Sequence, residues 1–270
     1  GAGSVINADR LGAVKQSLSC ALFVLSVTKS AVREREELHM IKTAVNSISA
    51  GILIAIGGSV YLACDNKYAG AALFSVALLC ICYLGYYLFT GKIGYLATDR
   101  SKKNALSLAL GLAVNLAVTF LLGMLIRFVM PALGEKAATL CGAKLGQSFM
   151  GTFIRAVFCG VLMYLAVQIF KEKKTPIGII FCIPVFILSG FEHSIADMFY
   201  FGASGIFSIK VLSFELAAVL GNSVGSLILP LLAMLGQNGQ GGGVISASSK
   251  SKGNPPAAHL IRLAEKANSH

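Results

Sequence analysis

Three ionisable side chains follow a long apolar run in the second half of the chain. The run IGIIFCIPVFILS is followed directly by GFEHSIADMFYF, which contains Glu192, His193 and Asp197. A histidine titrates near neutral pH, so His193 can donate either a proton or a hydrogen bond to a ligand. Ionisable residues inside a membrane span are costly and generally functional, so this segment predicts a site.

The three residues have different expected roles. His193 is the candidate proton donor, and its alternative role is a neutral imidazole that bridges two helices. Glu192 should point elsewhere, toward backbone N–H groups at a break in the helix. Asp197 lies four residues after His193 and shares its face if the segment is helical, where its charge would stabilise an imidazolium. The alternative role of Asp197 is to cap a helix N-terminus.

A second polar interruption lies in LFTGKIGY, which runs from Leu88 to Tyr95. The Thr90 hydroxyl can donate a further hydrogen bond to a ligand, or it can cap the half-helix that follows. Lys92 either adds positive potential near such a site or extends its ammonium group to the membrane interface. Free N–H groups at the start of a half-helix would also favour an anion.

The composition places these residues in a membrane protein. The chain has 270 residues, of which 56% are hydrophobic and only 13% charged, with a mean hydropathy of +0.75. Soluble domains are about 25% charged, and a membrane span needs about 20 apolar residues. On this rule the sequence predicts an all-α membrane protein with six transmembrane helices, at residues 43–64, 69–97, 105–130, 148–170, 176–201 and 210–235.

The positions of Lys and Arg predict the orientation of the spans. Most of the 23 basic residues fall before the first span, between the second and third, between the fourth and fifth, and after the sixth. Cytoplasmic loops retain Lys and Arg, so both termini should be cytoplasmic in a multi-pass protein of the inner (plasma) membrane. The net charge of +11 then reflects topology and attraction to the lipid bilayer, and it does not indicate nucleic-acid binding.

The remaining segments carry weaker signals. The seven cysteines lack CxxC spacing and paired histidines, so we expect no disulfide, no metal and no cofactor. Residues 1–42 predict a cytoplasmic segment with an interfacial amphipathic helix. Residues 236–270 have the composition of a linker and predict a disordered cytoplasmic tail. Residues 43–235 are predicted to form the unit of six transmembrane helices.

Two of the predicted spans are broken at comparable places. The second span is interrupted at Thr90 and the two residues after it, and the fifth around Gly190. Matched interruptions in two halves indicate an inverted repeat with broken helices two and five and a site at the midplane. Asn115 follows Thr90 by 25 residues, and Asn222 follows His193 by 29. An asparagine in a span is costly unless hydrogen-bonded, so we expect both to tie down a broken helix.

Four features in this order resemble the signature of the formate/nitrite transporter family: LFTGKIGY, the third-span Asn115, GFEHSIADM and VLGN, which ends at Asn222. The resemblance covers residues 43–235. It implies a homopentamer of aquaporin-like protomers, each with its own pore for a small monovalent anion and protons. Thr90 and His193 match the family's pore threonine and histidine. The resemblance further implies that Leu88 and Phe89 lie in a loop that breaks the second helix. It also implies hydrophobic constrictions formed by Phe74, Leu78 and Phe186.

Three positions depart from the family pattern and bear on the substrate. Asp197 stands where the family usually has Asn, Gly160 stands near its usual fourth-span Asn, and Lys92 stands where a neutral residue is commoner. The lysine makes LFTGKIGY more similar to the hydrosulfide-conducting branch than to the formate branch. The predicted function is a channel or transporter for formate, nitrite or hydrosulfide in which His193 assists protonation. The alternative is a transporter of larger weak acids such as acetate or lactate.

An intramembrane enzyme is the other class to weigh. The segment GASG, Gly202 to Gly205, resembles the GxSG of rhomboid intramembrane serine proteases. That chemistry needs a histidine base within reach of Ser204. The histidines after this serine are His259 and His270, which lie in the polar tail. We therefore expect no enzyme, and GASG should end the fifth helix with a glycine turn.

Overall fold

The computed structural model describes residues 2–239, with side chains described for residue 28 and residues 30–236. Over this range the chain is helical and contains no strand, as the composition predicts. In chain order the elements are α1 (Ala2–Ala63), α2 (Lys67–Leu84), α3 (Phe89–Lys92), the 3-10 helix η1 (Ile93–Ala97), α4 (Lys102–Val129), α5 (Pro131–Leu145), α6 (Phe149–Lys173), α7 (Ile177–Leu188), α8 (Ser194–Ser204) and α9 (Ile209–Gly239).

Five helices, α1, α2, α4, α6 and α9, contain a stretch that is long and apolar enough to cross a membrane. α7 has only 12 residues, and the predicted fifth span therefore consists of two short helices, α7 and α8. Large apolar side chains lie on the outside, for example Phe128, which is 84% exposed, and Ile209, which is 78% exposed. Such a surface suits lipid better than water. The chain is a multi-pass membrane protein.

Short polar residues begin three of the long helices. The Asn66 side chain accepts hydrogen bonds from the Tyr68 and Ala69 N–H groups at 2.9 and 3.1 Å, and so caps α2. Ser101 caps α4 and Ser148 caps α6 in the same way, each through the N–H group three residues later. Each cap satisfies a backbone donor that the helix itself leaves free, which fixes where these helices start.

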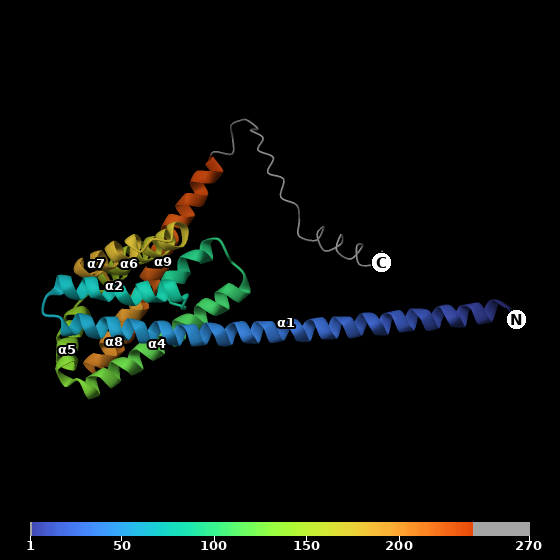
Figure 1. Ribbon diagram of the computed structural model, residues 1–270, viewed down its shortest axis with the longest axis horizontal. Coiled ribbons are helices and arrows are strands. Elements are labelled where there is room, and N and C mark those ends of the chain that lie inside the picture. The colour runs from blue at the N-terminus through green and yellow to red at the C-terminus, as the bar shows by residue number, and fades with distance from the viewer. Residues whose placement is uncertain (1, 240–270) are drawn as a thin grey trace, which may run out of the picture. The chain divides into compact units, whose positions relative to one another are not determined.

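The two halves of the chain repeat one order of elements. The first half consists of α1, the broken pair α2 and α3, and α4; the second consists of α6, the broken pair α7 and α8, and α9. Figure 1 shows α1 running alongside α2, and the two helices pack against each other. α3 packs against α6 of the second half, and α8 packs against α4 of the first. Each broken helix therefore reaches into the other half.

Three boundaries differ from those predicted. α1 is continuous, so no break separates residues 2–42 from the first span, and the interfacial helix there stays a prediction. The second span breaks at Gly85 and not at Thr90, because Gly85 takes a left-handed conformation (φ 71°) that ends α2. The predicted tail from residue 236 begins inside α9, and the rest of it lies outside the described residues.

A glycine lets α6 and α9 approach each other closely. A Cβ atom on Gly160 of α6 would lie 2.3 Å from the Asn222 carbonyl oxygen and 2.9 Å from the Ser226 backbone nitrogen, both in α9. These are backbone atoms, which cannot turn aside as a flexible side chain can. Small residues at helix interfaces allow such close packing in membranes. Gly160, one of the three departures from the family pattern, is therefore a packing position beside Asn222.

We expect Gly160→Ala to destabilise the fold by about 1–3 kcal/mol, because the added methyl group forces α6 and α9 apart. The measurement is the melting temperature of the purified protein in detergent. Gly142→Ala is the matched control, since a Cβ there meets no atom within 4 Å and alanine is the better helix former. Equal melting temperatures for the two variants would contradict this account of the contact.

Candidate functional site

Asn115 of α4 holds the broken backbone of the second span. Its side-chain oxygen accepts a hydrogen bond from the Phe89 N–H group at 2.9 Å. Its side-chain nitrogen donates to the carbonyl oxygens of Ser47 in α1, at 2.8 Å, and of Tyr87, at 3.1 Å. Asn115 is fully buried. The side chain thus replaces helix hydrogen bonds that the break removes, as backbone at membrane depth requires.

Asn222 of α9 does the same for the fifth span. Its side-chain oxygen accepts the Ser194 N–H group at 2.9 Å. Its side-chain nitrogen donates to the carbonyl oxygens of Ala156 in α6, at 2.9 Å, and of Glu192, at 2.8 Å. The expectation that both asparagines tie down a broken helix is confirmed by these hydrogen bonds.

The matched hydrogen bonds align the two breaks. Both asparagines bind the N–H group of the first residue of a short helix, α3 in one half and α8 in the other. The residue before that helix is Leu88 in the first half and His193 in the second, each in extended backbone with φ −105° and −114°. These two residues are therefore equivalent, whereas the spacing in the sequence had matched Thr90 with His193. Thr90 lies two residues after Leu88. It is not the equivalent of His193 in the first half but contacts His193 directly.

His193 and Thr90 meet in the buried interior. The His193 Nε2 and Thr90 Oγ1 atoms are 2.8 Å apart, and both residues are buried. On the other side of the ring, Nδ1 accepts the Ala196 N–H group at 3.1 Å, so the imidazole caps α8. A ring nitrogen that accepts a hydrogen bond carries no proton. The hydrogen bonds therefore assign the proton of the neutral ring to Nε2, which donates to Thr90 Oγ1.

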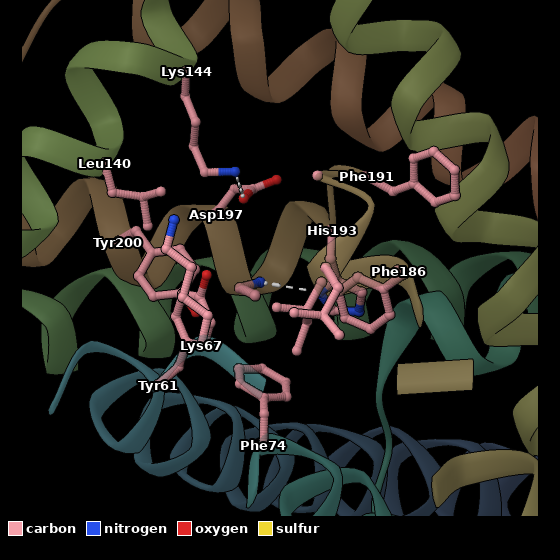
Figure 2. Close-up of a pocket in the computed structure, with 14 residues that line it drawn as sticks. Tyr61, Lys67, Phe74, Leu140, Lys144, Phe186, Phe191, His193, Asp197 and Tyr200 are labelled. Carbon is pink, nitrogen blue, oxygen red and sulfur yellow. Dashed lines mark hydrogen bonds and ion pairs between the residues drawn. The ribbon is translucent and has the colours of Figure 1, made fainter. Parts of the chain in front are cut away.

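Apolar side chains surround this polar pair. The Phe186 ring stacks on the His193 ring with centroids 5.6 Å apart (Figure 2), and it meets the Phe74 ring edge-on at 6.5 Å. Phe74 and Leu78 lie one turn apart on α2 and share a face. Leu78 and Leu88 are each 1% exposed, so the apolar surroundings continue past the histidine.

These apolar side chains line parts of two cavities. The first has a volume of about 260 Å³ and is lined by Phe74, Phe186 and His193 among others (Figure 2). The second has a volume of about 170 Å³ and is lined by Leu78 and Leu88. The start of α2 lines the first cavity and its end lines the second, and no residue lines both. Phe74 and Phe186 of the first lining and Leu78 and Leu88 of the second are all buried.

Lys144 of α5 joins the two carboxylates that lie on either side of His193 in the sequence. Its ammonium group forms ion pairs with Glu192 and, at 2.9 Å, with Asp197; Figure 2 shows the second pair. Gln147 donates a further hydrogen bond to Glu192 at 2.7 Å. Burial lowers the pKa of Lys144, but the charges of Asp197 and Glu192 outweigh it and hold this pKa above its usual value. Lys144 therefore stays charged in the wall of the first cavity.

These contacts correct the roles predicted for the two acids. Glu192 binds the side chains of Lys144 and Gln147, and its carboxylate does not bind the backbone N–H groups expected for it. The Asp197 carboxylate pairs with Lys144 and makes no hydrogen bond with His193, and His193 caps α8 in its place. Sequence reasoning missed Lys144 because it lies 48 residues before Glu192. Only the fold of α5 brings it to the site.

The residues of LFTG lie around the first break. Thr90 lies inside α3 and does not cap it, since the N-cap position is Leu88 and no side chain bonds there. Phe89 begins α3 and is buried. The Lys92 Nζ atom lies 5.9 Å from the centre of the Tyr87 ring, and Lys92 lines the second cavity. Of its two expected roles, the contribution of positive potential to a cavity fits this position.

The GASG serine is bonded to backbone atoms. Ser204 Oγ donates to the Phe201 carbonyl oxygen at 2.8 Å and accepts the Ile206 N–H group at 3.1 Å. Gly205, with φ 69°, ends α8, as the sequence predicts. Among the residues described, none of the hydrogen bonds to Ser204 comes from a histidine, and no group of three or more His, Cys, Asp or Glu could hold a metal ion.

We expect Lys144→Met to destabilise the protein by about 3–5 kcal/mol, because it leaves two buried carboxylates without their cation. Lys136→Met is the matched control. Lys136 pairs with Asp65 at 3.0 Å, but the Asp65 side chain is 96% exposed, and such surface pairs contribute about 0–1 kcal/mol. Melting temperatures in detergent compare the two variants. A loss for Lys136→Met as large as for Lys144→Met would rule out the buried ion pairs as the cause.

The chain has relatives among known transporters. Residues 23–236 match the family model of the formate/nitrite transporters. The uncharacterized transporter YwcJ of Bacillus subtilis (strain 168) is 32% identical over 191 residues, which cover 61% of this chain and 73% of YwcJ. The formate channel FocB of Escherichia coli (strain K12) is 27% identical over 207 residues, which cover 65% of this chain and 72% of FocB.

The fold also matches a solved structure. A pentameric formate channel with formate bound superposes with a TM-score of 0.65 at 22% sequence identity, over 75% of this chain and 99% of that chain. At this identity the likeness shows a shared fold. The family match is broader evidence, since it extends from within α1 into α9 and takes in both breaks and both asparagines. The chain therefore belongs to the formate/nitrite transporter family.

Proposed function

We propose that the chain forms a membrane pore for small monovalent anions of the class of formate, nitrite and hydrosulfide. The observation that carries the proposal is the contact of His193 Nε2 with Thr90 Oγ1, 2.8 Å apart. This pair is a polar centre in otherwise apolar surroundings. In the proposed pore, the buried side chains of Phe74, Phe186, Leu78 and Leu88 form the constriction between the two cavities. Membership of the formate/nitrite transporter family and similarity to FocB support the substrate class.

The polar pair would offer an anion a hydrogen bond where it has lost its water. His193 Nε2–H donates to Thr90 Oγ1, and the Thr90 hydroxyl proton can then point to the anion. Taking a bare ion out of water costs several kcal/mol. A hydrogen bond to a charged group returns about 1.5–3 kcal/mol of this, so the bond lowers the barrier without removing it.

Protonation of the anion would lower the barrier further. An acid of pKa about 4 takes up a proton at pH 7 at a cost of about 4 kcal/mol, which is comparable with the cost of desolvation. His193 can pass a proton on only through Thr90, because its Nδ1 is occupied by the Ala196 N–H group. For full transfer the ring must first gain a proton on Nδ1, and that proton displaces the bond to Ala196. Proton transfer is thus coupled to the start of α8.

We further propose a homopentamer in the plasma membrane with both termini cytoplasmic. The solved structure with the same fold is a pentameric formate channel, and the distribution of Lys and Arg supports the orientation. Acetate and lactate are the alternative substrates. The Phe74 and Phe186 rings meet edge-on with their centroids 6.5 Å apart. Any anion must separate the two rings to pass, and a larger anion must separate them further, which favours the smaller anions.

The test is anion uptake by proteoliposomes over a range of pH around neutrality. We expect Thr90→Val and His193→Asn each to lower formate uptake about tenfold or more, because each removes a hydrogen-bonding group at the constriction. Thr139→Val is the matched control, since Thr139 is exposed on α5 and its hydroxyl bonds only the Glu135 carbonyl of the same helix.

Two results would count against the proposal. Uptake by Thr90→Val equal to that of Thr139→Val would make the polar pair a structural contact with no part in transport. If the wild type moved none of formate, nitrite, hydrosulfide, acetate or lactate, the pore itself would be refuted. Faster uptake of lactate than of formate would favour the alternative substrate class.

A further inference from the structure

The second cavity collects positive charge. Lys92 of α3, Lys171 of α6 and Lys174 line it together with mostly apolar side chains, and no acidic residue lines it. Lys171 is repelled by the positive charges of both Lys92 and Lys174. None of the three forms a salt bridge within the described part of the chain.

The groups beside this lysine cluster do not neutralise it. Glu172 follows Lys171 in the chain, but its carboxylate accepts a hydrogen bond from Gln168 at 2.5 Å and does not line the cavity. The Lys171 Nζ atom lies 3.6 Å from the centre of the Tyr95 ring. An aromatic face stabilises an ammonium group but leaves the net charge unchanged. The lining therefore holds no acidic counter-charge for its three lysines.

We propose that this cavity is a binding site for a small, doubly charged oxyanion of the phosphate or sulfate type. Lysine binds such anions as a point charge. A monovalent anion would leave two of the three positive charges unbalanced, whereas a doubly charged oxyanion balances two and presents oxygens in several directions. The cavity volume of about 170 Å³ admits an anion of this size together with some of its water.

A bound oxyanion would block the pore from this end. The cost of taking an ion into a low-dielectric interior grows with the square of its charge, so a doubly charged anion stops before the constriction. The cavity reaches Leu78 and Leu88 of that constriction, and a bound anion would occupy the path to them. The effect on flux rests on the proposed pore, but the binding site does not.

Binding is tested on the full chain in detergent by its melting temperature in increasing sulfate or phosphate, with chloride added to hold the ionic strength constant. A ligand that binds the folded state raises the melting temperature with its concentration. Lys171→Met should require about tenfold more sulfate for the same rise. Lys173→Met is the matched control, because it removes the same charge from the same last turn of α6 but does not line the cavity.

The comparison of these two variants is the readout, because sulfate and phosphate also stabilise proteins without binding a site. An equal response to sulfate in the wild type, Lys171→Met and Lys173→Met would overturn the site. In phosphatidylcholine vesicles, sulfate on the lysine side should inhibit formate uptake by the wild type and by Lys173→Met, with Lys171→Met about tenfold less sensitive. Binding without inhibition would overturn the block. A wild type that moves none of formate, nitrite, hydrosulfide, acetate or lactate without sulfate would refute the pore while leaving the binding result intact.

Discussion

Backbone N–H and C=O groups cannot be left free at membrane depth, and this constraint governs both broken helices. A side-chain amide offers one acceptor and two donor hydrogens, and Asn115 and Asn222 each use this full set on the backbone around a break. In each case one of the bonds also reaches a neighbouring long helix, α1 or α6. The asparagine thus fixes a break and the helix beside it together. The cavities and the polar centre both depend on these fixed breaks.

One scaffold carries different side chains in its two halves, and the difference makes the site. The position before the short helix is Leu88 in the first half, which adds to the apolar surroundings, and His193 in the second, which provides the polar centre. The two cavities also differ. In the first, Lys144 is paired with acids, whereas the lysines of the second have no acid in its lining. A repeat of backbone therefore produces two cavities whose linings differ in charge.

The features that could be predicted from the sequence are those with a local signal. Long apolar runs predict the spans. An asparagine inside such a run predicts hydrogen bonds to the backbone of a broken helix, and the structure contains these bonds. The break of the second span was misplaced because polarity and backbone geometry mark different residues. Thr90 is polar but helical, whereas Gly85 ends the helix within an apolar sequence. Lys144 could not be assigned to the acids because a separation of 48 residues leaves no pattern in the chain.

The position of His193 links the charge of its ring to the fold. Its Nδ1 atom accepts a hydrogen bond from the Ala196 N–H group in the first turn of α8. A proton on Nδ1 would point at this N–H group, and two hydrogen-bond donors that face each other repel. The free N–H groups at the start of a helix also disfavour a positive charge there. A nearby anion reverses this balance, because it stabilises the imidazolium that the helix disfavours. In the proposed pore, the ring would therefore gain its proton only when an anion is present, so the geometry favours joint passage of anion and proton over passage of the bare anion.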